Sequence, residues 1–82
     1  MKLLVTYSHG YNAQMAQEIG SLGNLILTLE KTYWQVDMTL DQFMAKWNRP
    51  MQVYPIQEKT APDSFGCDFL VIITNRGSFQ TR

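Results

Sequence analysis

Residues 25–50 constrain the fold more than any other part of the chain, because several independent local rules agree there. Leucine occupies every second position along 25–30, and two sets of side chains again alternate along 32–38. These two runs meet near Glu30 and Lys31. A period of two is typical of β-strands, so the pattern predicts a hairpin. We expect the aromatic and aliphatic side chains of this region to face inward, between the hairpin and the helix that follows, with Trp34 and Trp47 at that contact.

The helix after the hairpin has recognisable start and stop signals. Thr39 is followed three positions later by Gln42, which is the spacing of a capping box. Pro50 cannot continue a helix and marks its end. Apolar residues then repeat along one helical face between these signals. They are Leu40, Phe43, Met44 and Trp47.

Local patterns in the rest of the chain predict a small α/β fold of the α+β type. We expect a two-layer sandwich with four to five strands, two helices on one face, and the order β-α-β-β-α-β-β. Pro55 places the strand 51–56 at a sheet edge. The chain is predicted to form a single domain over 1–82. The other expected segments are a strand at 2–7, a turn at 8–10, a helix capped by Asn12, a loop at 59–66, an interior strand at 68–74, a turn at 75–77 and a frayed tail at 78–82.

Charge and composition narrow the classes of function. Seven basic and seven acidic residues cancel, whereas nucleic-acid binders usually have a basic surplus, so nucleic acid is not expected as a partner. Only 17% of the residues are charged, against about 25% in an average domain, and amide side chains supply much of the polarity. No apolar run is long enough to span a membrane, so a cytoplasmic location is expected. A single cysteine, Cys67, allows neither an internal disulfide nor a zinc site built from cysteines.

Candidate catalytic and metal-binding residues each have a simpler structural interpretation. His9 and Cys67 would form a nucleophilic pair only if they met in space, and the simpler interpretation is a turn histidine and a buried thiol. Four aspartates invite an acid–base or Mg²⁺ hypothesis, but helix starts and turns account for them. These aspartates are Asp37, Asp41, Asp63 and Asp68. We therefore predict no catalytic residue, no metal ion and no cofactor.

The aromatic residues of the middle region allow two interpretations. Tyr33, Trp34, Phe43 and Trp47 resemble a base-stacking group, but their spacing matches the faces expected to be buried, so a core role is favoured. Tyr33 falls on the opposite face of its strand from Trp34. Together with Gln35 it is predicted to mark an exposed patch, since tyrosine is a favoured interface residue.

The first twenty residues resemble the opening of flavodoxin-like domains. The strand 3–7 leads into the loop Ser8-His9-Gly10-Tyr11-Asn12 and then into a helix with Met15-Ala16 and Ile19. The resemblance implies that Ser8, Gly10 and Asn12 hold a flavin phosphate at the start of that helix, where backbone N–H groups point outward. Tyr11 interrupts the family's Gly-Asn pair, and the chain is far shorter than a doubly wound flavin domain, so the resemblance is limited to this segment.

Taken together, these observations predict a small non-enzymatic protein-interaction module. It would act as an inhibitor or adaptor of the kind encoded by phages or mobile elements, and self-association through the edge 51–56 is a further expectation. The alternative function is a small-ligand domain for a phosphate, nucleotide or flavin, and a cysteine-dependent enzyme is a third hypothesis. The predicted partner contacts are Tyr33, Gln35, Tyr54, Arg76 and Phe79, and the predicted ligand contacts are Ser8, His9, Gly10 and Asn12.

Overall fold

The computed structural model describes residues 2–8 and 12–74, which form one sheet, two α-helices and a short 3₁₀ helix. The elements follow the predicted order of strands and helices along the chain. Their bounds are β1 Leu3–Tyr7, α1 Ala13–Gly20, β2 Asn24–Leu27, β3 Thr32–Val36, α2 Leu40–Lys46, β4 Met51–Pro55, η1 Pro62–Ser64 and β5 Phe69–Ile73.

The five strands form one mixed sheet in the order β2-β3-β1-β5-β4. The central strand β1 pairs parallel with β5, from Leu3 opposite Phe69 to Tyr7 opposite Ile73. All other neighbours are antiparallel. Strands β2 and β4 are therefore the two edges, which confirms the edge position predicted from Pro55. The flavodoxin-like resemblance does not extend to the fold, because a doubly wound domain has a mainly parallel sheet.

Both α-helices start at the residues that the sequence predicts. The Asn12 side chain accepts a hydrogen bond from the Met15 N–H at 2.9 Å. Thr39 and Gln42 form the full capping box, each side chain accepting from the other's backbone N–H at 3.1 Å. These bonds satisfy N–H groups that a helix start leaves unpaired, so the two helices have defined first turns. No helix within the described residues has the length and apolarity to cross a bilayer.

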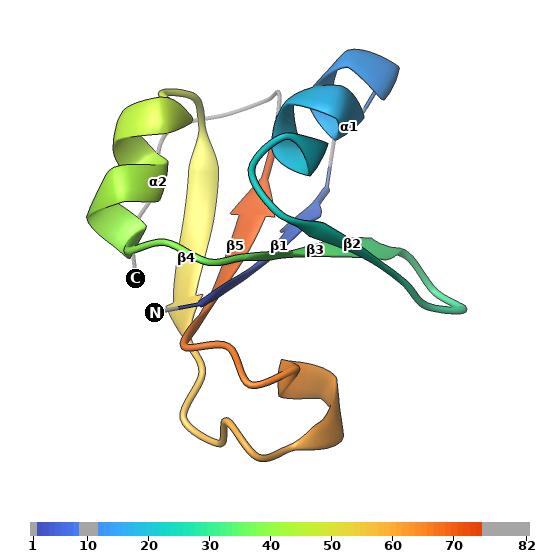
Figure 1. Cartoon of the computed structure of the whole chain (residues 1–82), viewed down its shortest axis with the longest axis vertical. Coiled ribbons are helices and arrows are strands. Elements are labelled where there is room, and N and C mark those ends of the chain that lie inside the picture. The colour runs from blue at the N-terminus through green and yellow to red at the C-terminus, as the bar shows by residue number, and fades with distance from the viewer. Residues whose placement is uncertain (1, 9–11, 75–82) are drawn as a thin grey trace.

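The core lies between the two helices and one face of the sheet (Figure 1). Trp34, Phe43 and Trp47 are almost completely buried there, and the rings of Phe43 and Trp47 stack 6.4 Å apart. The prediction that both tryptophans face inward is confirmed. The remaining buried members come from every strand except β2 and from α1.

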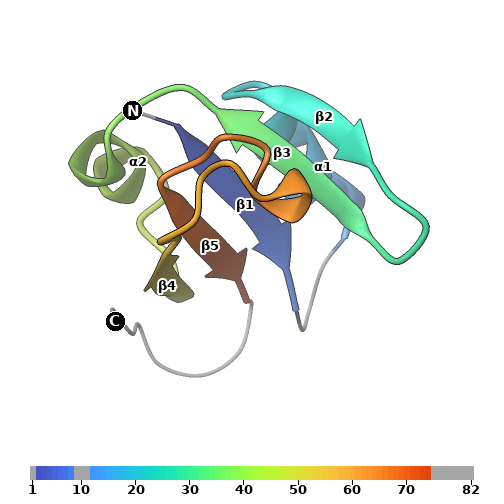
Figure 2. The same ribbon diagram turned by 90° about the horizontal axis from the view of Figure 1, so that it is seen from below.

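The opposite face of the sheet is covered by the loop at residues 56–68, which contains η1. Figures 1 and 2 show this loop on the side of the sheet away from both helices. Leu4 and Thr6 are buried beneath that side. The loop explains why a chain of this size buries side chains on both faces of its central strand.

The prediction that the aliphatic side chains of the middle region face inward is wrong for three leucines. Leu25, Leu27 and Leu29 are 57%, 73% and 105% exposed. Leu25 and Leu27 lie on the helix side, opposite Trp34 and Thr32 of β3, but β2 is the outermost strand and neither helix covers it. Alternation identified the strand correctly, yet it could not place that strand at an edge.

Candidate functional site

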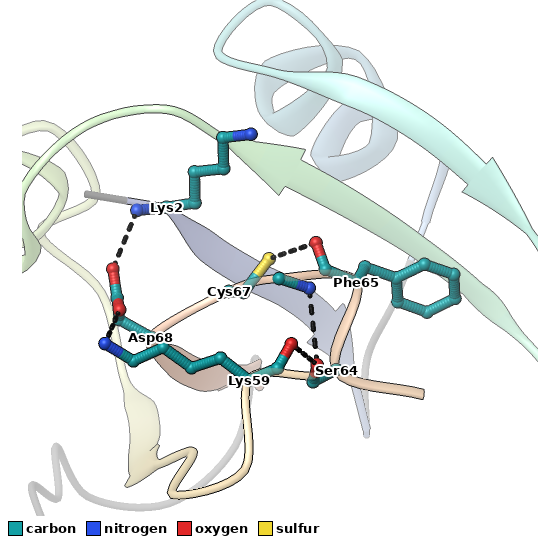
Figure 3. A network of polar contacts seen from close by, with 7 residues as sticks. Lys2, Lys59, Ser64, Phe65, Cys67 and Asp68 are labelled. Carbon is teal, nitrogen blue, oxygen red and sulfur yellow. Dashed lines mark hydrogen bonds and ion pairs between the residues drawn. The ribbon is translucent and has the colours of Figure 1, made fainter. Parts of the chain in front are cut away.

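The loop at 56–68 is held to the sheet by a compact polar network (Figure 3). The buried Ser64 hydroxyl lies 2.6 Å from the Lys59 carbonyl and 2.8 Å from the Ala61 carbonyl. Phe65 and Gly66 then adopt positive φ angles of 52° and 72°, a conformation that is unusual for phenylalanine. This turn directs the Phe65 carbonyl toward β3, where it accepts a 2.8 Å hydrogen bond from the Gln35 side chain.

Asp68 joins the end of the loop to the start of the chain. Its carboxylate accepts a 3.1 Å hydrogen bond from the Lys2 backbone N–H and forms a 2.5 Å ion pair with Lys59. The hydrogen bond and charge of Lys59, together with the Lys2 N–H, hold the pKa of Asp68 below its ordinary value. The negative form is therefore the one that the folded loop stabilises.

Cys67 is fully buried next to this network. Burial raises the pKa of its thiol, and this effect exceeds the opposite effect of a hydrogen bond from Gln35. The neutral thiol is a poor nucleophile, which fits the interpretation of Cys67 as a small buried residue. His9, its proposed catalytic partner, lies outside the described residues.

The predicted partner-binding residues that the structure describes lie at two separate places on the loop side of the sheet. Tyr33 lies beside the Phe65 ring, with ring centres 6.4 Å apart, and Gln35 binds the Phe65 carbonyl, so both residues hold the loop to the sheet. Tyr54 lies on the same face but on the far edge strand β4, where its hydroxyl is 3.3 Å from Gln52. Arg76 and Phe79 lie outside the described residues.

The predicted ligand loop is described only at its two ends. The Ser8 N–H donates to the Ile73 carbonyl at 2.8 Å, extending the pairing of β1 with β5. The Asn12 side chain already caps α1. His9 and Gly10 lie outside the described residues, so phosphate binding at this loop stays a prediction.

The aspartates considered as acid–base or metal groups are dispersed. Asp41 is in the first turn of α2, as expected, and Asp63, which was expected in a turn, is in the short 3₁₀ helix of the loop. Within residues 2–8 and 12–74, no three His, Cys, Asp or Glu side chains gather closely enough to hold a metal ion.

The edge strand β2 is the most unusual part of the described surface. Residues 24–29 contain no charged residue and no proline, although edge strands normally have such residues to prevent pairing with other chains. The turn that follows is well ordered, because the Thr28 hydroxyl accepts from the Lys31 N–H at 3.1 Å and donates to the Lys31 carbonyl at 2.7 Å. Leu29 is therefore held fully exposed at the end of a projecting hairpin (Figure 1).

The hydrogen-bond pattern of the hairpin shows which backbone groups of β2 point outward. The Thr28 N–H donates to the Lys31 carbonyl, and hydrogen-bonded pairs alternate along an antiparallel ladder. Ile26 therefore bonds to β3, whereas Leu25 and Leu27 direct their N–H and C=O groups away from it. Leu25 and Leu27 therefore combine exposed side chains with backbone N–H and C=O groups that point outward from the edge of the sheet.

A shallow groove of about 420 Å³ runs between α1 and the helix side of β2. Every residue that lines this groove is uncharged. Leu25 and Leu27 form one wall, and Ala16 and Gly20 of α1 form the other. The outer edge of β2, the exposed side chains of Leu25, Leu27 and Leu29, and this groove form one continuous apolar surface. We call it the β2 surface.

The β2 surface was not predicted from the sequence, although residues 24–29 contain a signal for it. Residues 24–29 read Asn-Leu-Ile-Leu-Thr-Leu, so one alternating face holds only leucines and the other holds Asn24, Ile26 and Thr28. An apolar face of this kind is also typical of a strand that packs on a core, and the short turn at 28–31 does not reveal which side of the hairpin pairs with the rest of the sheet.

Comparisons with known proteins assign no family. No family model matches the chain, and comparisons with curated proteins and with solved structures find no match.

Proposed function

We propose that this chain is a small non-enzymatic protein-interaction module, an inhibitor or adaptor, that docks a protein partner on the β2 surface. The observation behind the proposal is the row of exposed leucines on an uncharged edge strand. Contiguous exposed apolar surface of this kind usually marks an interaction site.

The geometry of the β2 surface suits addition of an extended strand from the partner. The outward N–H and C=O groups of Leu25 and Leu27 would supply main-chain hydrogen bonds. The groove beside α1 would receive side chains from the partner's strand and so provide selectivity. This mode of binding needs no acid, base or nucleophile, and the buried thiol with a raised pKa fits a non-enzymatic role.

A photocrosslinking experiment tests the proposal directly. A photoreactive amino acid at position 29, at the end of the hairpin, should form a protein adduct in the cells that naturally make this chain. The same group at the exposed position 60, on the loop that covers the opposite face, serves as the matched control. The adduct at position 29 should disappear when Leu27→Lys places a charge in the groove.

Two outcomes would contradict the proposed docking surface. One is the absence of any protein adduct at position 29. The other is an equal yield of the same adduct from positions 29 and 60, which would indicate non-specific collision.

A further inference from the structure

We infer that the occupant of the β2 surface is a second copy of this chain, paired through two antiparallel β2 strands. The two five-stranded sheets would then form one continuous sheet of ten strands. This inference rests on the proposed function, because it names the partner that docks at the same surface.

The backbone of β2 matches its own copy when the two strands run antiparallel. We place Leu25 opposite the partner's Leu27, with Ile26 next to the two-fold axis. Both leucines direct their N–H and C=O groups outward, so each Leu25–Leu27 pair between copies exchanges two hydrogen bonds. A symmetric interface requires this self-complementarity, since each copy presents the same surface.

The side chains match in the same arrangement. A two-fold axis perpendicular to the sheet keeps both α1 helices on one side of the joined sheet. The groove beside α1 in each copy then opens toward the leucines of the other. Leu25 and Leu27 would cover the partner's groove, and the most exposed apolar side chains of the strand would leave water.

The absence of charge in the β2 surface favours an identical partner. Two copies of a charged patch bring like charges together, which costs affinity. The groove lining and residues 24–29 contain no charge, so two copies meet without repulsion. A different protein would have to supply an extended segment with matching apolar side chains, whereas a second copy presents such a segment by symmetry.

The other edge of the sheet does not share these properties. Just beyond the two ends of the β4–β5 pair, the Thr74 N–H donates to the Pro50 carbonyl and the Ile56 N–H donates to the Asp68 carbonyl. By alternation, Met51, Val53 and Pro55 direct their backbones outward, and Pro55 has no N–H to donate. The side chains of Met51 and Val53 are fully buried. The self-association expected at residues 51–56 is therefore reassigned to β2.

The size of the surface predicts a dimer that depends on concentration. A standard interface covers about 800 Å² on each partner, roughly a sixth of the 5158 Å² surface of this chain. The β2 surface consists of one four-residue strand, one turn and one side of α1, so we expect it to cover less than that area. We therefore expect monomer and dimer to exchange over the accessible concentration range.

Sedimentation equilibrium of the purified chain tests the inference. The average mass should rise from 9.5 kDa toward twice that value as concentration increases. Leu27→Lys and Leu27→Pro should each weaken dimerisation by about tenfold or more. The lysine places a charge at the centre of the contact, and the proline removes one of its hydrogen-bond donors. Residue 27 does not bond to β3, so proline there removes an outward N–H and an exposed side chain and should leave the monomer folded. Thr60→Lys, on the exposed loop, is the control for added charge.

Amide hydrogen exchange identifies the interface independently of these variants. In the dimer the N–H groups of Leu25 and Leu27 should become protected as concentration rises. The Ile26 N–H, which bonds within the hairpin, should be protected at every concentration.

The outcomes separate this inference from the proposed function. A chain that stays monomeric, or whose dimer is insensitive to both Leu27 variants, would overturn the inference. If position 29 then crosslinks to a different protein, docking at the β2 surface still stands. If it crosslinks to nothing, both proposals fail.

Discussion

Gly23 lies where the chain passes from α1 into β2, and the neighbouring strand leaves no room for a side chain there. An added Cβ would lie 2.4 Å from the Gln35 carbonyl oxygen and 2.7 Å from a methyl group of Val36. Real contacts of this kind do not occur without movement of the backbone. Gly23 is therefore required by the close approach of two chain segments.

Gly23→Ala should destabilise the protein by about 1–3 kcal/mol, the usual cost of forcing extra atoms into a packed site. That is a large share of a total stability of roughly 4–12 kcal/mol for a domain of this length. Urea unfolding followed by circular dichroism measures the difference.

Gly20→Ala is the matched control for this substitution. Its Cβ would meet only the Trp34 ring nitrogen at 3.9 Å, an ordinary contact. Gly20 is in α1, where alanine is favoured over glycine by about 0.5–1 kcal/mol. If Gly23→Ala and Gly20→Ala lost equal amounts of stability, crowding against β3 would not be the reason why residue 23 is glycine.

At the scale of elements, the loop at 56–68 acts as a third layer, on the face of the sheet opposite the two helices. It contains no long helix, and its position depends on contacts between residues far apart in sequence, such as Asp68 with Lys2 and Phe65 with Gln35. Because the contacts of Asp68 favour its charged form, we expect this layer to be less stable in acid.

The contribution of Asp68 to stability should depend on pH in a defined direction. Because its pKa is lowered on folding, its contribution is fully present above the ordinary value of 3.8 and is lost as the pH falls through the folded pKa. Urea unfolding at neutral and acidic pH should show wild type more stable than Asp68→Asn at neutral pH, with the difference shrinking in acid.

Lys59→Gln provides an intermediate case, since the Lys2 N–H still binds the carboxylate in that variant. It should show a smaller pH-dependent difference than Asp68→Asn. A difference between wild type and Asp68→Asn that does not change with pH would rule out this role for the carboxylate.

Elements with local signals could be predicted from the sequence, whereas their arrangement could not. The Thr39–Gln42 capping box spans three residues, and its signal is complete within that span. The exposure of Leu25 and Leu27 depends on β2 being outermost, which is decided by the pairing of β1 with both β3 and β5. The roles of Gln35 and Tyr33 likewise depend on a loop thirty residues further along the chain.

At the scale of the whole molecule, both helices and four of the strands contribute to one core. Trp34 is on β3 at one side of the sheet, while Trp47 follows α2 at the other. The ion pair between Arg49 and Glu18 at 2.6 Å joins the segment after α2 to α1. Neither helix has a separate set of core contacts. The β3 side of the core, with Trp34, and the α2 side, with Trp47, should therefore unfold together.

Variants that retain one tryptophan test this cooperativity. Fluorescence of Trp34→Phe reports the α2 side, and fluorescence of Trp47→Phe reports the β3 side. In each variant the fluorescence midpoint in urea should coincide with the midpoint from circular dichroism, as two-state unfolding requires. An earlier fluorescence transition in either variant would show that its side unfolds independently.

The parallel pairing of β1 with β5 also determines how late in its synthesis the protein can complete its sheet. The central strand gains its second neighbour only when residues 69–73 have been translated. Until then a nascent chain can form the hairpin of β2 and β3 but cannot close the sheet around β1. Such long-range pairing slows folding, so we expect the leucine-rich edge to be exposed before the interior of the protein is complete, a condition that favours contacts with chaperones.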